Sequence, residues 1–172
     1  YFKKIPGVID TSVGYANGKT NSTNYSNLKK TDHAETLKLI YDKDIISLQE
    51  ILEHYFRIID PTSINKQGND KGRQYRTGIY YTNKNDKLVI NEIIRQKQEN
   101  YDEKIAVEVA PLNNFILGED YHQDYLDKNP GGYCHINLAL ASKPLESKSE
   151  LMEKDKNKLK KELTEEQYNV TQ

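Results

Sequence analysis

ETLKLIYDKDIISLQEILEHYFRII, residues 35–59, joins a strand pattern to a helix pattern in one short stretch. Residues 35–41 alternate, with Leu37, Leu39 and Tyr41 on one face, and this period of two predicts a strand. Ser47 then predicts the N-cap of a helix, and Glu50 three residues later completes a capping box. One apolar stripe follows, made of Leu48, Ile51, Leu52, Tyr55, Phe56 and Ile59, and Asp60-Pro61 ends it.

The same criteria assign the rest of the chain, working outward from this stretch. They predict strands at 8–15, 76–81 and 105–109, helices at 85–101 and 119–126, and polar loops at 21–32 and 62–74. His54 lies on the central helix, where we expect it at the surface or boundary with no role. Interleaved strands and helices predict an α+β fold, a two-layer sandwich with helices packed on a small mixed β-sheet.

The two ends of the sequence predict its domain organisation. Tyr1 to Ile5 has helical spacing and is stopped by Pro6, so we expect Tyr1 to lie inside a helix that begins earlier in the protein. One domain is predicted at 1–138, followed by a Lys- and Glu-rich polar linker at 139–162. The last segment, 163–172, contains a capping box and is predicted to start another domain.

Composition excludes several classes of protein. The chain has 172 residues, with 25 Lys and Arg against 26 Asp and Glu, which argues against a nucleic-acid binder. Its single cysteine, Cys134, excludes an internal disulfide and a zinc–cysteine cluster. It has no run of 18 apolar residues and no leading signal peptide, so we expect no membrane span. A cytoplasmic location is the default expectation; export and anchoring to the envelope stay alternatives.

Polar residues with chemical potential gather in three places. They are His33 and Glu35 at a strand entrance, Asp70, Arg73, Gln74 and Tyr75 in a glycine-bearing loop, and His122 and Asp124 shortly before Cys134. Each has a plain alternative, such as an exposed carboxylate or a hydrogen-bonded loop residue. The histidine spacings match no metal-ligand motif, and no phosphate-binding loop is present. The chain has 13 Tyr, 3 Phe and no Trp, which favours tyrosines lining a polar pocket.

Five sequence blocks in one order identify a family resemblance over residues 1–138. They are YANG (15–18), HAE (33–35), QGNDKGRQYR (67–76), YHQDYL (121–126) and NPGGYC (129–134). Together they closely resemble the peptide methionine-(S)-S-oxide reductases, the MsrA family. The tail at 163–172 resembles the start of the MsrB family, which reduces the other sulfoxide epimer. The resemblance therefore implies an excerpt of an MsrA–MsrB fusion.

The resemblance implies a thiol-dependent reduction of methionine-S-sulfoxide, in proteins or free, to methionine. Glu35 is then the general acid, and Tyr25 and Tyr75 hydrogen-bond the sulfoxide oxygen. Asp70 orients these tyrosines or a water molecule in the pocket. His122 supports the substrate pocket. The family's nucleophilic cysteine stands in a Gly-Cys-Phe-Trp-Gly motif, which we expect just before Tyr1.

Cys134 matches the family's recycling cysteine. It is expected to attack a sulfenic acid on the nucleophile and form a disulfide, which thioredoxin or another dithiol reduces. No cofactor or metal is expected. The partners implied are oxidised proteins, methionine sulfoxide, thioredoxin and a covalently fused MsrB domain.

One departure and two alternative functions stand beside this interpretation. Asp32 replaces the glycine that the family usually has before His-Ala-Glu. It is expected to raise the pKa of Glu35 if it points inward, or to have no effect on it if it faces water. The chain is alternatively a catalytically incomplete module that binds oxidised methionine without reducing it. A third hypothesis makes Cys134 a hydrolase-type nucleophile with His122.

Overall fold

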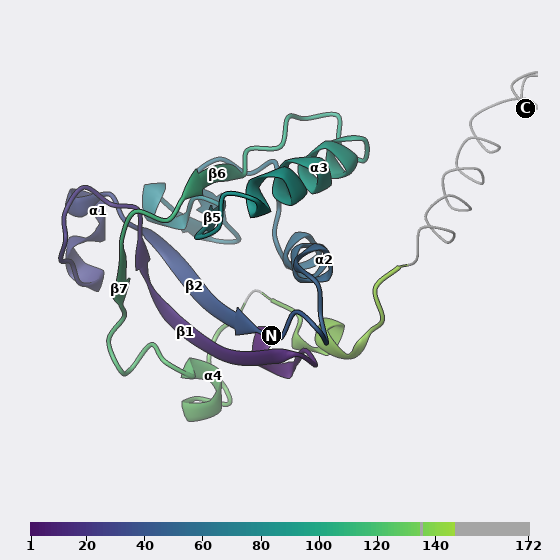
Figure 1. Ribbon diagram of the computed structural model, residues 1–172. Helices are drawn as coiled ribbons and strands as arrows, with labels where there is room; N and C mark the ends of the chain where they lie inside the picture. The colour runs from purple at the N-terminus through teal and green to yellow at the C-terminus, as the bar shows by residue number, and fades with distance from the viewer. Residues whose placement is uncertain (135, 147–172) are drawn as a thin grey trace, which may run out of the picture. The chain divides into compact units, whose positions relative to one another are not determined.

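The computed structural model describes residues 1–134 and 136–146. The chain divides into two compact units, Tyr1–Ser142 and Lys143–Gln172, and only residues 143–146 of the second are described. The first unit combines helices with small sheets (Figure 1), which confirms the predicted α+β class. Most of the predicted linker at 139–162 and all of the segment at 163–172 lie outside the described residues.

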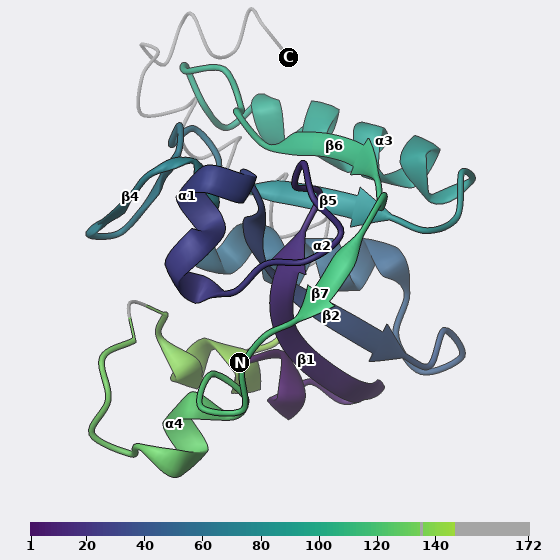
Figure 2. The ribbon, with the colours of Figure 1, turned by 90° about the vertical axis from the view of Figure 1, so that its left-hand side faces the viewer.

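A three-stranded antiparallel sheet carries the predicted strands at 8–15 and 35–41. β1 (Val8–Ala16) lies in the centre, between β2 (Ala34–Tyr41) and β7 (Phe115–Leu117). The register pairs Tyr15 with Glu35 on one side and with Ile116 on the other. Figure 2 shows β7 running beside β1.

Two smaller sheets hold the remaining strands. β5 (Gly78–Tyr81) and β6 (Glu108–Pro111) pair in parallel, and α3 (Asp86–Gln98) makes the crossover between them. β3 (Lys66–Gln67) and β4 (Asp70–Lys71) form a short antiparallel hairpin. Parallel and antiparallel pairings therefore fall in separate sheets, and not in one mixed sheet as predicted.

α2 (Leu48–Ile58) begins as the sequence predicts. Ser47 Oγ accepts a hydrogen bond from the Glu50 amide at 3.2 Å, and the Ser47 amide donates to Glu50 Oε2 at 2.9 Å. The apolar stripe of α2 contacts two buried clusters. One contains Phe2, Ile5, Ile46, Ile51 and Ala141; the other contains Leu52, Phe56, Ile90, Ile93 and Ile105.

Several predicted elements differ from the structure. The loop at 21–32 contains two short helices, η2 (Tyr25–Asn27) and α1 (Leu28–Thr31), because Leu28 is buried and fixes them. The loop at 62–74 contains the β3–β4 hairpin and the start of η3 (Arg73–Tyr75).

The later elements are shifted along the chain. The strand predicted from residue 105 begins at Glu108, and the helix predicted at 119–126 is a turn followed by α4 (Tyr125–Lys128). Two further short elements, η1 (Phe2–Lys4) and η4 (Leu138–Ser142), lie near the ends of the first unit. No helix within 1–134 or 136–146 has the length and apolar character to cross a bilayer.

His54 is a correction at the level of a single residue. It is 6% exposed, because the face of α2 that bears it is covered by the N-terminal turn. Its Nδ1 lies 2.9 Å from the hydroxyl of Tyr1, and the two rings meet edge to face. The prediction of a surface histidine was therefore wrong, and His54 instead holds η1 against α2.

Candidate active site

Glu35 lies at the second position of β2, where its main chain pairs with Tyr15. Its carboxyl oxygen Oε1 is buried and has no hydrogen-bond partner among the described residues. Burial is the main cause that raises the pKa of Glu35 to about 7, and the negative charge of Asp70 adds to it. A carboxyl group with this pKa is half protonated near neutral pH and is suited to donate a proton.

Asp70 and Tyr75 come from the glycine-bearing loop. Gly68 (φ 57°) permits the turn of the β3–β4 hairpin, which places Asp70 on β4. Gly72 (φ 138°) precedes η3, and a Cβ there would lie 2.3 Å from the Gln74 side-chain oxygen. These two glycines therefore set the path of the loop.

Glu35, Asp70 and Tyr75 all line one groove of about 930 Å³. The groove runs along β2 and is bounded by α2 and β5. The pKa of the Tyr75 phenol is raised, first by its hydrogen bond with Tyr25, then by burial, with Glu35 and Asp70 adding their negative charges. Glu35 and Asp70 are thus close enough to act on the ionisation of Tyr75.

Tyr25 lies on η2 and completes the cluster. Its hydroxyl is 3.4 Å from the Tyr75 hydroxyl, and its ring centroid is 4.9 Å from that of His122. His122 Nε2 is buried without a hydrogen-bond partner in the described part of the chain. The structure therefore brings together Glu35, Asp70, Tyr75, Tyr25 and His122, which come from four separate sequence blocks or loops.

Glu119 supports the candidate site by its hydrogen bonds, and the sequence analysis missed it. Its Oε1 accepts a hydrogen bond from the Tyr25 amide at 2.9 Å, and its Oε2 accepts one from the buried Tyr15 hydroxyl. Burial opposes ionisation of Glu119, but these hydrogen bonds prevail and hold its pKa below the usual value. Tyr25 and Glu119 are 94 residues apart in the sequence, so no local sequence pattern could have indicated their contact. It is visible only in the folded structure.

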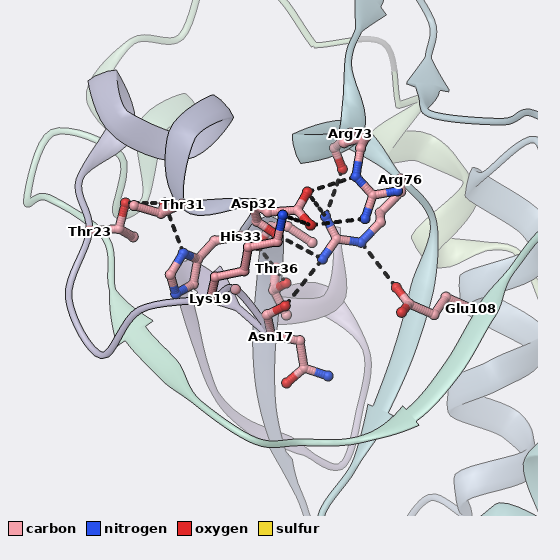
Figure 3. Close-up of polar contacts among 12 residues, drawn as sticks. Asn17, Lys19, Thr23, Thr31, Asp32, His33, Thr36, Arg73, Arg76 and Glu108 are labelled. Carbon is pink, nitrogen blue, oxygen red and sulfur yellow. Dashed lines mark hydrogen bonds and ion pairs between the residues drawn. The ribbon is translucent and has the colours of Figure 1, made fainter.

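His33 is a second support of the site. It is fully buried, and its Nδ1 lies 2.9 Å from Thr31 Oγ1, which lies 2.7 Å from Thr23 Oγ1 (Figure 3). A Cβ at Gly18 would lie 2.0 Å from this ring, so the glycine is needed for the histidine to pack. His33 therefore ties the loop before Tyr25 to the start of β2.

Asp32 does not point towards Glu35. Its carboxylate faces Arg73, Lys19 and Arg76 (Figure 3), and the charge that acts on Glu35 comes from Asp70 instead. The expectation that Asp32 raises the pKa of Glu35 therefore does not apply.

Cys134 is exposed and lies near the N-terminal turn. Its Sγ accepts a hydrogen bond from the Ile136 amide at 3.4 Å, and Ile136 lines the groove. Cys134 is within electrostatic range of the Tyr1 nitrogen. Within the described residues, no three His, Cys, Asp or Glu side chains are placed to hold a metal ion.

The chain is similar to known proteins over most of its length. A family model described as peptide methionine sulfoxide reductase matches residues 1–155. The reduced form of Mxr1 from Saccharomyces cerevisiae is 40% identical with a TM-score of 0.72, over 77% of this chain and 78% of that chain. Methionine sulfoxide reductase A of Corynebacterium diphtheriae is 34% identical with a TM-score of 0.73, over 77% of this chain and 69% of that one.

Proposed function

Because the chain belongs to the peptide methionine sulfoxide reductase family, a family of oxidoreductases, we propose that it acts on the S epimer of methionine sulfoxide, free or in proteins. The observation that carries this proposal is the buried, unpaired carboxyl oxygen of Glu35 beside Asp70 and the Tyr25–Tyr75 pair. A sulfoxide oxygen leaves poorly unless it is protonated, and this cluster offers a proton donor and two hydroxyl groups in one place.

Glu35 acts as the general acid. Its pKa of about 7 leaves a large share of the carboxyl protonated at neutral pH, whereas an ordinary glutamate with a pKa of about 4.3 is almost fully ionised. A thiolate attacks the sulfoxide sulfur and forms a sulfur–sulfur bond, while the proton of Glu35 moves to the oxygen. The hydroxyl group then passes to the cysteine sulfur, as the S–O bond to methionine and the new sulfur–sulfur bond both break. The products are methionine and a cysteine sulfenic acid.

The two tyrosines hold the sulfoxide oxygen next to Glu35. Their hydroxyl groups are 3.4 Å apart, so a single oxygen atom that lies beside the pair, at about 2.7 Å from each, is within hydrogen-bonding reach of both. Burial is the main factor that favours the protonated form of Glu35, and the negative charge of Asp70 adds to it. His122 packs on the Tyr25 ring and limits its movement.

Two thiols complete the cycle. We assign the attacking thiolate to the Gly-Cys-Phe-Trp-Gly segment of the family, which we expect a few residues before Tyr1 in the whole protein. Cys134 then attacks the sulfenic acid, which releases water and leaves a disulfide, and thioredoxin or another dithiol reduces that disulfide. The proximity of Cys134 to the backbone nitrogen of Tyr1 supports this pairing.

The test uses the whole protein, with its upstream cysteine, and the two epimers of N-acetylmethionine sulfoxide. With thioredoxin as reductant, we expect turnover of the S epimer by this domain; any turnover of the R epimer by the whole protein is assigned to the fused MsrB domain. Glu35→Gln keeps the shape of the side chain but has no acidic proton, so we expect a loss of about 10²- to 10⁴-fold in kcat/KM. Undiminished turnover by this variant would remove Glu35 from its role.

Cys134→Ser separates recycling from attack. This variant is expected to form one equivalent of methionine per protein molecule and then stop with thioredoxin. If Cys134 were itself the nucleophile, no methionine would form. Binding of the S epimer by the unaltered whole protein without any methionine formation would instead favour the module that binds oxidised methionine.

A further inference from the structure

Asp32 occupies a backbone conformation that few side chains adopt. It follows α1 with φ 58° and ψ 25°, in the left-handed region, and its amide donates to the Leu28 carbonyl at 2.9 Å. A side chain in this region costs of order 1 kcal/mol relative to glycine, although Asp and Asn tolerate it better than most residues. The turn that begins here leads within three residues to Glu35.

The Asp32 carboxylate forms a bidentate ion pair with Arg73. Arg73 Nε donates to Oδ1 at 2.7 Å and its NH2 group donates to Oδ2 at 3.1 Å. Lys19 Nζ lies 3.7 Å and Arg76 NH1 lies 3.9 Å from the same carboxylate. Only 19% of the Asp32 side chain is exposed, so these charges are partly shielded from water.

Arg76 joins the same two segments a second time. Its side chain is only 9% exposed, and it donates to the main-chain carbonyls of Asp32 at 3.1 Å and of Arg73 at 2.9 Å. It also pairs with Glu108 of β6 at 3.0 Å (Figure 3). Arg73 and Arg76 flank Tyr75 in the sequence, so both ends of the Tyr75 turn are attached to Asp32.

We propose that Asp32 is a positioning residue, whose carboxylate holds the turn bearing Tyr75 in place against the strand bearing Glu35. The clamp consists of Asp32, Arg73 and Arg76. It acts through Tyr75 and touches neither the substrate nor the reacting sulfur. Its effect on catalysis rests on the proposed reductase function, whereas its effect on the turn is independent of that function.

The clamp is charged throughout the pH range in which Glu35 titrates. The hydrogen bond from Arg73 is the main cause that lowers the pKa of Asp32, although burial opposes it. Asp32 therefore stays ionised while Glu35 passes from its protonated to its ionised form.

Amide hydrogen exchange of the 172-residue chain tests the clamp without any catalysis. Asp32→Gly removes the carboxylate and relieves the backbone at the same time, so the fold is expected to persist while the turn loosens. We expect the amides of Tyr75 and Arg76, which bond to Gly72 and Arg73 carbonyls, to exchange about 3- to 10-fold faster. Asp32→Asn keeps the side-chain volume, and its effect is expected to be smaller but in the same direction.

Glu92→Gln is the matched control, because it removes one charge from an ion pair with Arg95 on the surface of α3, away from the site. It is expected to leave the exchange of Tyr75 and Arg76 unchanged. Unchanged exchange of these two amides in both Asp32 variants would overturn the proposal.

Steady-state kinetics of the whole protein then test the link to Tyr75. Asp32→Gly is expected to lower kcat about 10-fold with little change in KM, since a small displacement of Tyr75 weakens its bond to the sulfoxide oxygen. Combined with Tyr75→Phe, it is expected to add almost nothing to the loss from Tyr75→Phe alone. Full additivity would show that Asp32 does not act through Tyr75.

The two proposals fail in different ways. If the unaltered whole protein reduces no sulfoxide but the Asp32 variants speed amide exchange, the reductase function fails and the clamp stands. If the unaltered protein is an active reductase and amide exchange does not respond to Asp32, the clamp fails and the function stands.

Discussion

Glu35 and Asp70 show how one residue sets the chemistry of another. Burial of the Glu35 carboxyl disfavours its charged form, and the negative charge of Asp70 disfavours it further. Both causes act in the same direction, so the proton stays on Glu35 to a higher pH. The raised pKa of Glu35 is therefore expected to affect the pH dependence of both kcat/KM and the free energy of unfolding.

The rate is expected to fall as Glu35 ionises. Below about pH 6 the acid is protonated, and above its pKa of about 7 we expect kcat/KM of the whole protein to drop up to tenfold per pH unit. Asp70→Asn removes the second cause of the raised pKa, so the midpoint is expected to move to lower pH. A pH–rate profile with the same midpoint in both proteins would contradict the role given to Asp70.

The raised pKa of Glu35 is also expected to make the free energy of unfolding depend on pH. The pKa of Glu35 is higher in the folded state than in the unfolded state. Protonated Glu35 therefore adds to the free energy of unfolding; this contribution is complete below about pH 4.5 and is lost as the pH rises through 7. Glu35→Gln lacks this dependence. Its free energy of unfolding relative to the unaltered chain is expected to improve by about 1–2 kcal/mol between pH 5 and pH 8, measured by urea denaturation.

The sequence could predict the residues of the site but not their supports. Glu35, Tyr75 and Asp70 follow from family blocks that lie next to strands and glycines, so their positions depend on local structure. Glu119 supports Tyr25 from 94 residues away, and its sequence surroundings resemble those of any surface carboxylate. The orientation of Asp32 depends on Arg73, which only the folded loop brings near.

At the scale of elements, α2 is the part whose start and face the sequence predicts well. Its capping box and apolar stripe are both local patterns, and both are present in the structure. β7 was missed because three residues are too few to show a period, and it is fixed only by pairing with β1. α1 was missed because a single buried leucine holds it among polar neighbours.

Ser47→Ala tests the start of α2. Loss of the side-chain oxygen leaves the Glu50 amide without its cap, so the free energy of unfolding is expected to fall by about 1 kcal/mol. Glu50→Gln is the matched control, because glutamine also serves in a capping box, and its loss is expected to be smaller. Urea denaturation with an unchanged m-value measures both. Equal losses in the two variants would contradict the capping role of Ser47.

At the scale of the whole molecule, α2 connects the two buried clusters. Ile51 belongs to the cluster with Phe2, and Leu52 to the cluster with Ile90 and Ile93. Tyr55 packs against both, and its hydroxyl donates to the Gly78 carbonyl at 3.1 Å. The antiparallel sheet and the β5–β6 pair are thus held together through one helix.

Leu52→Ala tests this arrangement against a matched leucine. Leu52 is 3% exposed, and its truncation is expected to lower the free energy of unfolding by about 2–5 kcal/mol. Leu88 is 75% exposed on α3, and Leu88→Ala is expected to change it by less than about 0.5 kcal/mol. The measurement is the urea midpoint of each variant. Similar midpoints for Leu52→Ala and Leu88→Ala would contradict the role of buried Leu52 in the core.

The hydrogen bond from Tyr25 to Glu119 has a consequence for heating. Glu119 follows β7, an edge strand whose ladder with β1 covers three residue pairs and is extended by the Gln123 side-chain bonds to Val13. We expect this short attachment to open before the helices unfold. Tyr25 would then lose its anchor before the rest of the protein melts. On heating, reductase activity of the whole protein is therefore expected to be lost at a temperature several degrees below the midpoint at which the helical circular dichroism signal is lost. The site would then melt separately from the helices.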